Sequence, residues 1–219
     1  MTNSQRQALF DRWAAKYDSS VANAAGNFPF DGYDRVLAAV VEAADAKSGM
    51  TVLDVGTGTG QLAELFLAHA CVAWGVDFSA EMLAQARTRL PQAQFVQADL
   101  LAEAWPMLPA QFDCIVSAYV FHEFDLRTKV AVLQRLVKQH LAPGGRLVIG
   151  DIAFPTVAGR SAAATRWVAE WDEDEFYWAA DESVSAFQSV GLAFEYRQLS
   201  SCAGVFLLSP AGSALFSKR

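Results

Sequence analysis

The stretch VLDVGTGTGQ, residues Val52 to Gln61, places three glycines within five positions directly behind an apolar run. A short run rich in Val and Leu is typical of a buried strand, and glycines mark the point where the chain turns. Glycine permits unusual φ angles and lets a ligand lie against the main chain without a Cβ in the way. We therefore expect the first strand of an α/β sheet to end in a ligand-binding turn at Gly56, Gly58 and Gly60.

Beyond the glycines, strand-like and helix-like segments alternate along the chain. We expect strands at 50–55, 71–76, 93–97, 112–118 and 146–152, with helices at 61–70, 80–90 and 126–141 between them. This alternation implies right-handed crossovers and a parallel sheet covered by helices on both faces. After residue 154 a helical, aromatic and acidic segment leads to strands at 192–199 and 203–208. We expect these two strands to form an antiparallel hairpin within the sheet.

Composition and charge limit the kinds of molecule that the protein is expected to bind. Of the 219 residues, 53% are hydrophobic and 19% are charged, which is typical of a folded globular domain. The net charge of −7 argues against nucleic acid and anionic membranes, because both are bound through clustered Lys and Arg. Charged residues in the first twenty positions argue against a signal peptide, and no stretch is long and apolar enough to span a membrane. We expect a cytoplasmic protein; its oligomeric state stays open.

Three aspartates stand at the ends of predicted strands. Asp54 precedes the glycines, Asp77 ends the next strand in GVDFS, and Asp99 follows the third in VQADLL. A dinucleotide fold requires GxGxxG, whereas Gln61 occupies the position of its third glycine. Asp54 would repel a pyrophosphate but attract an ammonium group, and the other two acids suit ribose hydroxyls and an adenine amine. The acids therefore favour S-adenosylmethionine as cofactor, and an NAD-dependent oxidoreductase is the alternative.

The chain resembles the class I S-adenosylmethionine-dependent methyltransferases. The matching segments are VLDVGTGTGQLAE, WGVDFSAEMLAQAR, FVQADLL, FDCIVSAYVFHEF and LAPGGRLVIGDIAF, in family order from Val52 to Phe154. Within the family it is most similar to small bacterial members of unsettled substrate, including the YrrT-like group. The resemblance implies a Rossmann-like, doubly wound sheet of seven strands in the order 3-2-1-4-5-7-6, with strand 7 antiparallel. It also implies an enzyme that transfers a methyl group from S-adenosylmethionine and leaves S-adenosylhomocysteine.

The resemblance also implies a cofactor role for particular residues. The three glycines would contact the methionine part of the cofactor, with Asp54 near its amino group. Asp77 would bind the ribose and Asp99 the adenine amine. The remaining cofactor contacts implied by the resemblance are Tyr17, which would close over the cofactor, Phe78, Met82 and Leu100 around the base, and Ala118.

Candidate catalytic residues follow the fourth and fifth strands. His122 is a candidate general base if the acceptor must lose a proton, and the alternative is a histidine that orders the following helix. Asp151 would bind the acceptor or orient a neighbour. Tyr119 would line the pocket rather than ionise, because an unperturbed tyrosine has a pKa near 10. We expect no metal site, since the three histidines are scattered and none has a partner at ligand spacing.

We interpret residues 1–219 as one methyltransferase domain. Residues 1–48 are predicted to form an N-terminal helical lid, residues 49–154 the cofactor-binding core, and residues 155–219 acceptor-side helices and the C-terminal hairpin. Phe10, Trp13, Ala14 and Tyr17 recur at helical spacing, which predicts one helix that closes the pocket.

The acceptor side of the pocket is expected to lie outside the cofactor-binding core. The aromatic segment 167–178 is expected to supply a second wall, and its acids either face solvent or bind a positive group. The acceptor itself is expected to be a small molecule, because the chain has no basic tract and no substrate-recognition domain. The alternative within the same fold is a protein that binds S-adenosylmethionine or S-adenosylhomocysteine without turnover.

Overall fold

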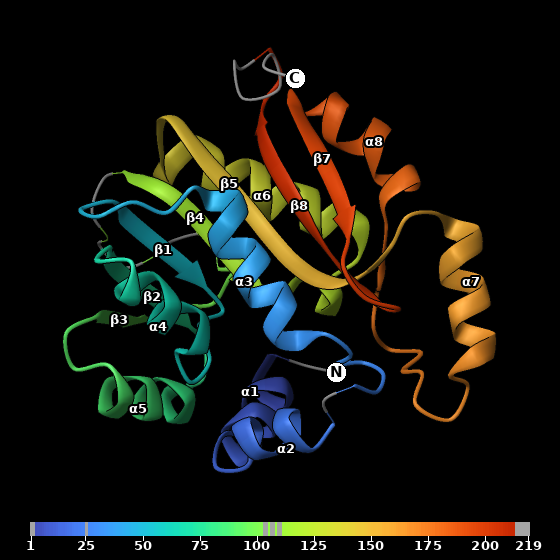
Figure 1. Cartoon of the computed structure of the whole chain (residues 1–219), viewed down its shortest axis with the longest axis horizontal. Coiled ribbons are helices and arrows are strands. Elements are labelled where there is room, and N and C mark those ends of the chain that lie inside the picture. Colours follow the sequence, from blue (N-terminus) through green and yellow to red (C-terminus); the bar gives the residue numbers. More distant parts are fainter. Residues whose placement is uncertain (1–2, 25, 103–104, 106–107, 109–110, 213–219) are drawn as a thin grey trace.

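A twisted sheet runs through the molecule with helices on both of its faces (Figure 1). The structure is a computed structural model that describes residues 3–24, 26–102, 105, 108 and 111–212, without the side chains of residues 3–6, 9 and 13. The strands follow the order β3-β2-β1-β4-β5-β8-β7, and β6 pairs with β5 outside this path. The bounds are β1 (Thr51–Val55), β2 (Val72–Asp77), β3 (Gln94–Gln97), β4 (Phe112–Ala118), β5 (Leu141–Phe154), β6 (Trp178–Ala179), β7 (Leu192–Gln198) and β8 (Ala203–Pro210).

The predicted strand order and the single antiparallel strand are confirmed. β1 to β5 pair in parallel, while β8 runs antiparallel to β5 on one side and to β7 on the other. The expected strands 6 and 7 are β7 and β8, because the two-residue strand β6 comes before them. β5 begins at Leu141, earlier than expected, and its pairing with β4 shifts register between Phe112 and Cys114. That irregularity accommodates the Pro-Gly-Gly turn predicted at 143–145 within the strand.

The helices agree with the predicted ones except at the N-terminus and in the segment predicted to be helical after residue 154, where residues 167–177 are not helical. They are α1 (Asn3–Ala14), α2 (Tyr17–Asn23), α3 (Tyr33–Ala44), α4 (Gln61–Ala68), α5 (Ala80–Arg89), the 3-10 turn η1 (Phe121–Glu123), α6 (Leu126–His140), α7 (Val157–Arg166) and α8 (Ala180–Ser189). The single helix expected through residue 17 is wrong, since the chain breaks at residues 15–16 and Tyr17 begins α2. Tyr17 is therefore directed by a different helix from Phe10.

Side chains on the central strands alternate between two hydrophobic clusters, as the two-residue period of a strand requires. On β1, Val52 packs in the cluster that includes α3 and α4, whereas Leu53 packs in the one that includes α6 and α8. The same division holds on β4 for Val116 and Ile115 and on β5 for Val148 and Leu147. Because helices cover both faces, a ligand approaches this sheet at the carboxyl ends of its strands.

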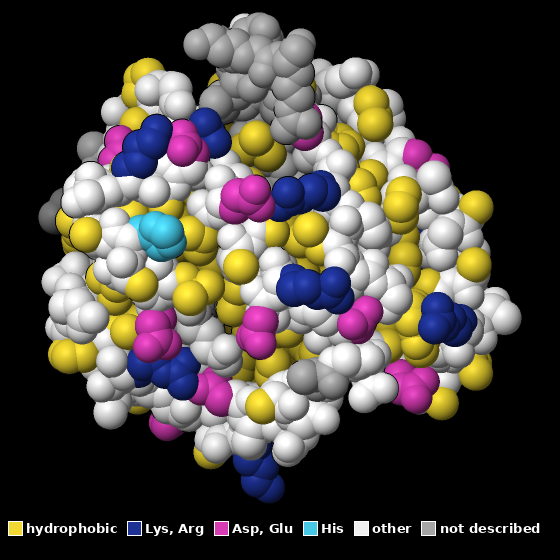
Figure 2. Space-filling view, in the orientation of Figure 1, with side chains coloured by type: hydrophobic (Ala, Val, Ile, Leu, Met, Phe, Trp, Pro, Cys, Tyr) yellow, Lys and Arg dark blue, Asp and Glu magenta, His cyan; other side chains and the backbone are white. Residues whose placement is uncertain are grey.

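Charged side chains of opposite sign are neighbours over much of one face of the molecule (Figure 2). Arg146 and Lys47 both pair with Asp45, and Arg197 pairs with Glu42. Exposed pairs of this kind each contribute little to stability. Among the described residues, no helix combines the length and apolar character that crossing a bilayer requires.

Candidate functional site

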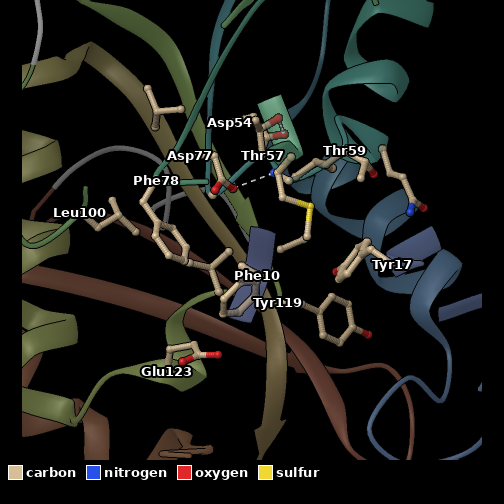
Figure 3. Close-up of a pocket in the computed structure, with 18 of the residues that line it drawn as sticks. Phe10, Tyr17, Asp54, Thr57, Thr59, Asp77, Phe78, Leu100, Tyr119 and Glu123 are labelled. Carbon is tan, nitrogen blue, oxygen red and sulfur yellow. Dashed lines mark hydrogen bonds between the residues drawn. The ribbon is translucent and has the colours of Figure 1, made fainter. Parts of the chain in front are cut away.

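A pocket lies where β1, β2 and β4 end, roofed by the N-terminal helices (Figure 3). Most of the residues that the sequence analysis assigns to the cofactor line it. These are Tyr17, Asp54, Gly56, Gly58, Asp77, Phe78, Met82, Asp99, Leu100 and Ala118. Residues that the sequence analysis did not assign to the cofactor also line it, among them Thr57, Thr59, Tyr33 and Glu123.

The glycine turn after β1 has the backbone that its sequence predicts. Gly56, Gly58 and Gly60 have φ angles of 71°, 54° and 88°, the left-handed region that favours glycine. A Cβ on Gly56 would collide with the side chain of Val120, whereas one on Gly58 would enter open space. Gly60 does not line the pocket; it precedes the first turn of α4. The turn thus exposes main chain to the pocket at Gly56 and Gly58.

Asp77 fastens this turn to the end of β2. Its Oδ2 accepts a hydrogen bond from the Gly58 N–H at 2.9 Å, and its Oδ1 accepts one from the Ser79 N–H at 2.9 Å. Burial raises the pKa of Asp77 to about 6, although these N–H groups favour its charge. Each carboxylate oxygen has a second lone pair. Asp77 therefore positions the loop and still has acceptor capacity for a ligand in the pocket.

Asp54 is almost completely buried at the head of the pocket. Its Oδ2 accepts a hydrogen bond from the Thr57 hydroxyl at 2.7 Å. Burial raises the pKa of Asp54 to about 7, and the charge of Asp77 adds to this effect. A cationic group in the pocket would favour the ionised form of Asp54 and be attracted by it. The chemistry of this position fits the ammonium group expected from the sequence.

Two aspartates fasten the N-terminal helices over the pocket. Asp18 on α2 accepts hydrogen bonds from the Thr59 hydroxyl at 2.7 Å and the Gln61 amide at 2.8 Å, and it pairs with Arg89. Although burial opposes its ionisation, these donors hold the pKa of Asp18 below its usual value. The sequence analysis missed this role of Asp18, which is adjacent to Tyr17.

A second attachment joins α1 to α5. The Ser79 hydroxyl donates to Asp11 at 2.5 Å, while its oxygen accepts from the Met82 N–H and so caps α5. The ring of Phe10 contacts the ring of Phe78 edge-on, with centroids 5.3 Å apart. Residues Phe10 and Tyr17 both line the pocket from above, whereas the side chain of Trp13 lies outside the described residues.

Three tyrosines, Tyr17, Tyr33 and Tyr119, also line the pocket. Burial raises the pKa of Tyr17 to about 12 and raises those of Tyr33 and Tyr119 as well, so all three phenols are neutral at ordinary pH. The rings of Tyr33 and Tyr119 stack with centroids 4.8 Å apart. Tyr119 has a φ of 56°, and its buried hydroxyl has no hydrogen-bond partner among the described residues. The geometry fits the expectation that Tyr119 lines the pocket without ionising.

His122 and Asp151 lie behind the pocket rather than among its lining residues. The His122 Nδ1 is 2.6 Å from the Asp151 Oδ1, and the His122 backbone N–H donates to Oδ2 at 2.9 Å. Trp178 and the backbone of Ile152 also donate to this fully buried carboxylate. Although burial opposes protonation, the charge of Asp151 raises the pKa of His122 to about 9. A pKa raised in this way favours the ordering role over the general base, and either role stays a prediction.

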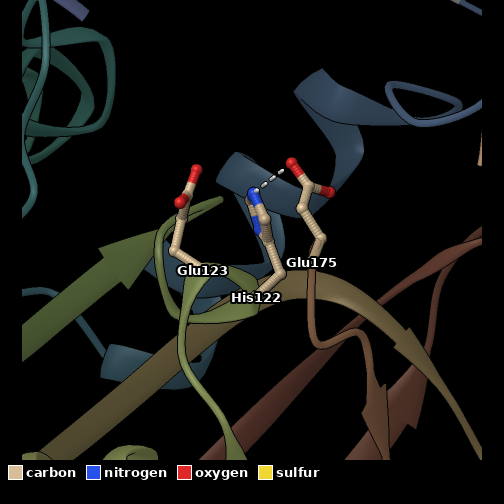
Figure 4. A group of neighbouring side chains, drawn as sticks. All are labelled: His122, Glu123 and Glu175. Carbon is tan, nitrogen blue, oxygen red and sulfur yellow. Dashed lines mark ion pairs between the residues drawn. The ribbon is translucent and has the colours of Figure 1, made fainter. Parts of the chain in front are cut away.

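The aromatic segment 167–178, predicted to form a second wall of the pocket, lies beside the pocket instead. Trp167 and Trp171 stack on Phe28 with centroids 5.0 and 5.7 Å away, and Trp171 contacts Tyr177. No residue of 167–178 belongs to the described lining of the pocket, because these rings pack with one another beside it. Of the four acids in the segment, residues 172–174 are exposed, whereas Glu175 is partly buried and turns toward His122 (Figure 4).

Comparisons with known proteins converge on one family. Residues 52–145 match the family described as "Methyltransferase domain". A protein of Geobacillus thermodenitrificans named "Uncharacterized methyltransferase" is 32% identical over 200 residues, which cover 87% of this chain and 90% of that protein. "Uncharacterized methyltransferase YrrT" of Bacillus subtilis is 30% identical over 200 residues, with coverage of 87% and 91%. A solved structure described as "DhpI-SAM-HEP complex" has the same fold, with a TM-score of 0.72 at 20% identity over 96% of this chain and 100% of that one.

Proposed function

The chain belongs to the class I S-adenosylmethionine-dependent methyltransferase family, and we propose that it transfers the methyl group of S-adenosylmethionine to a small-molecule acceptor. The observation that carries the proposal is the buried carboxylate of Asp54 beside an exposed glycine backbone at the carboxyl ends of β1 and β2. S-adenosylmethionine supplies an ammonium group for Asp54, a ribose for Asp77 and a base for the side of the pocket lined by Phe78 and Leu100.

In this proposal the donor extends along the pocket shown in Figure 3. Its methionine part lies against Gly56 and Gly58, with the ammonium group at Asp54. Its ribose hydroxyls bind the free lone pairs of Asp77. The adenine lies on the side of the pocket formed by Phe78, Met82, Asp99 and Leu100, and the wall that remains for the methyl group and the acceptor includes Tyr17, Ala118, Tyr119 and Glu123.

The reaction is an in-line displacement. A lone pair on the acceptor forms a bond to the methyl carbon while the carbon–sulfur bond breaks, and its electron pair goes to sulfur, which becomes a neutral thioether. The sulfonium already activates the methyl group, so the protein acts mainly by holding the two reactants in line. Orientation of this kind can supply on the order of 7–11 kcal/mol. The lid helices, fastened by Asp11 and Asp18, support this role by limiting water at the reacting atoms.

The pocket's enclosure supports a small acceptor. Helices α1 and α2 lie over the ends of the strands, and aromatic side chains from both of them line the cavity. A macromolecule would have to present its reacting atom beneath these helices. The proposal is therefore a methyltransferase that acts on small molecules.

Calorimetry followed by product analysis tests the proposal. Purified protein should bind S-adenosylmethionine and S-adenosylhomocysteine but not NAD. Incubation with a methyl-deuterated donor and a fractionated cell extract should then place the label in a low-mass product. NAD binding without donor binding would contradict the assignment, and label found only in protein or nucleic acid would contradict the small acceptor. Donor binding with no labelled product from any fraction would indicate a binding protein without turnover.

A further inference from the structure

Three side chains from two distant parts of the chain converge (Figure 4), and one of them, Glu123, lines the pocket. His122 and Glu123 follow β4 in η1, and Glu175 comes from the segment before β6. One ligand atom from each, the imidazole nitrogen and two carboxylate oxygens, lies within 4.8 Å of the others. A backbone hydrogen bond from the Phe176 N–H to the His122 carbonyl, 2.6 Å long, holds the two segments side by side.

The carboxylate of Asp151 orients the imidazole of His122. Its side chain is 10% exposed, and its Nδ1 is held by Asp151, so the other nitrogen, Nε2, points at Glu175. Within the described part of the chain Nε2 makes no hydrogen bond. Its charged neighbour is Glu175, whose Oε1 is 3.8 Å away, beyond hydrogen-bond distance. A histidine whose Nδ1 is held by a carboxylate presents Nε2 in the arrangement that metal-binding histidines use.

The carboxylate of Glu175 is oriented in the same way. It has a hydrogen bond with the Tyr177 hydroxyl, which in turn accepts from the Asp172 N–H at 3.4 Å. The separation of 3.8 Å between Nε2 and Oε1 is too long for a hydrogen bond. It does fit two ligands of one ion, because ligands with bonds of about 2.1 Å lie up to about 4.2 Å apart.

We propose that His122, Glu123 and Glu175 bind a divalent transition-metal ion of the manganese, iron or zinc type at the end of the pocket. One imidazole and two carboxylates favour these ions over calcium or magnesium, which take oxygen ligands almost exclusively. Asp151 and Tyr177 hold the ligands in place. The sequence analysis expected no metal, because Glu175 is far from the histidine in the chain and only the fold brings it there.

The ion would bind the methyl acceptor. This part of the proposal rests on the proposed function. Glu123 lines the pocket, so an ion bound to it has positions that face the pocket interior. Three protein ligands leave room for an oxygen of the acceptor, which selects an acceptor with a hydroxyl or carboxylate group. Coordination would lower the pKa of a hydroxyl, so its proton leaves to solvent and its oxygen attacks the methyl carbon as described above.

The test measures metal binding directly, without turnover. Chelator-treated protein is titrated with Mn²⁺ and followed by electron paramagnetic resonance. We expect one saturable site whose signal shows coupling to a nitrogen nucleus. Glu175→Gln should weaken Mn²⁺ binding at least about tenfold. Glu173→Gln makes the same charge change at an exposed neighbour and should leave binding unchanged. His122→Gln should remove the nitrogen coupling.

Binding of S-adenosylhomocysteine to the same chelator-treated samples separates the two proposals and reports folding. Unchanged S-adenosylhomocysteine affinity in Glu175→Gln, with Mn²⁺ binding lost, supports the metal site. Absence of saturable binding of Mn²⁺ and of Zn²⁺ to protein that still binds S-adenosylhomocysteine would overturn it, as would equal binding by both glutamate variants. Mn²⁺ binding by protein that does not bind S-adenosylhomocysteine would instead contradict the proposed function.

Discussion

The Thr59 hydroxyl donates a hydrogen bond to Asp18 at 2.7 Å and so joins the second helix of the lid to the glycine turn. The same carboxylate also holds Gln61 and Arg89, so one side chain connects α2 with the start of α4 and the end of α5. The position of Tyr17, the preceding residue in the chain, depends on this attachment.

Replacing Asp18 by Ala should therefore weaken donor binding. The change removes hydrogen bonds to a charged acceptor, and we expect about a tenfold higher Kd, equivalent to about 1.4 kcal/mol. Calorimetry with S-adenosylhomocysteine measures it. Asp34→Ala, an exposed acid on α3, is the matched control and should leave the Kd unchanged. Equal affinities for all three proteins would show that the lid does not contribute to the donor site.

Asp77→Asn should weaken binding of the methyl donor by about 1–3 kcal/mol, for two separable reasons. The amide keeps one acceptor oxygen but turns an NH₂ group toward the N–H of Gly58 or Ser79, and it also loses charge toward the ribose. The loss should be smaller when S-adenosylhomocysteine is replaced by its 2′-deoxy analogue, because that ligand lacks one of the hydroxyls concerned. An identical loss for both ligands would assign Asp77 to the loop alone.

The buried Asp54 predicts a pH dependence of stability with a defined sign. Burial raises its pKa to about 7, whereas an aspartate in the unfolded chain ionises near 3.9. Between these values the folded protein holds a proton that the unfolded chain has released, so stability falls as pH rises from about 4 to about 7. The slope from one such group is at most about 1.4 kcal/mol per pH unit.

Asp54→Asn should flatten that dependence and stabilise the protein at neutral pH while weakening donor binding. Urea unfolding at several pH values between about 4.5 and 7.5 measures the slope for both proteins. Part of the slope should remain, because burial also raises the pKa of Asp77, to about 6. A variant with the wild-type slope would mean that Asp54 is ionised throughout this range.

Tyr119→Phe should raise the free energy of unfolding by about 1 kcal/mol. The hydroxyl is buried without a hydrogen-bond partner among the described residues, and removing such a group relieves its desolvation cost. The ring, which stacks on Tyr33, is retained. Chemical denaturation measures the change. A lower stability would show that the hydroxyl has a partner, and lower turnover at equal stability would give it a role with the acceptor.

The parts of the site that depend on strand order could be predicted from the sequence. Asp54, Asp77 and Asp99 are far apart in the chain, yet all three end or follow parallel strands that are neighbours in the sheet. The carboxyl ends of such strands meet at one edge, so alternation of strands and helices is enough to bring the acids together. The glycines add a local signal, because a left-handed φ is required at each of them.

Contacts between segments without a regular pattern could not be predicted. Asp18 reaches Thr59, and Glu175 reaches His122, only because of the paths of the lid and of the segment before β6. The break at residues 15–16 was missed since the apolar spacing continues across it, and tertiary packing rather than spacing places Tyr17. The aromatic residues of 167–178 are of the types found in protein cores. Residue type alone does not show whether such side chains line a pocket or pack against one another next to it.

The contact between Gly56 and Val120 makes the cost of a side chain at position 56 depend on the residue at position 120. The valine methyl groups occupy the volume that a side chain at 56 would need, so Gly56→Ala carries a steric penalty and a backbone penalty. Shortening Val120 to Ala would relieve the first but not the second, since a φ of 71° costs alanine about 1–2 kcal/mol wherever its neighbours lie. The two substitutions are therefore coupled through the steric penalty alone, while the backbone penalty at position 56 is independent of Val120. A larger side chain at position 56 therefore keeps a penalty that no change at position 120 can remove.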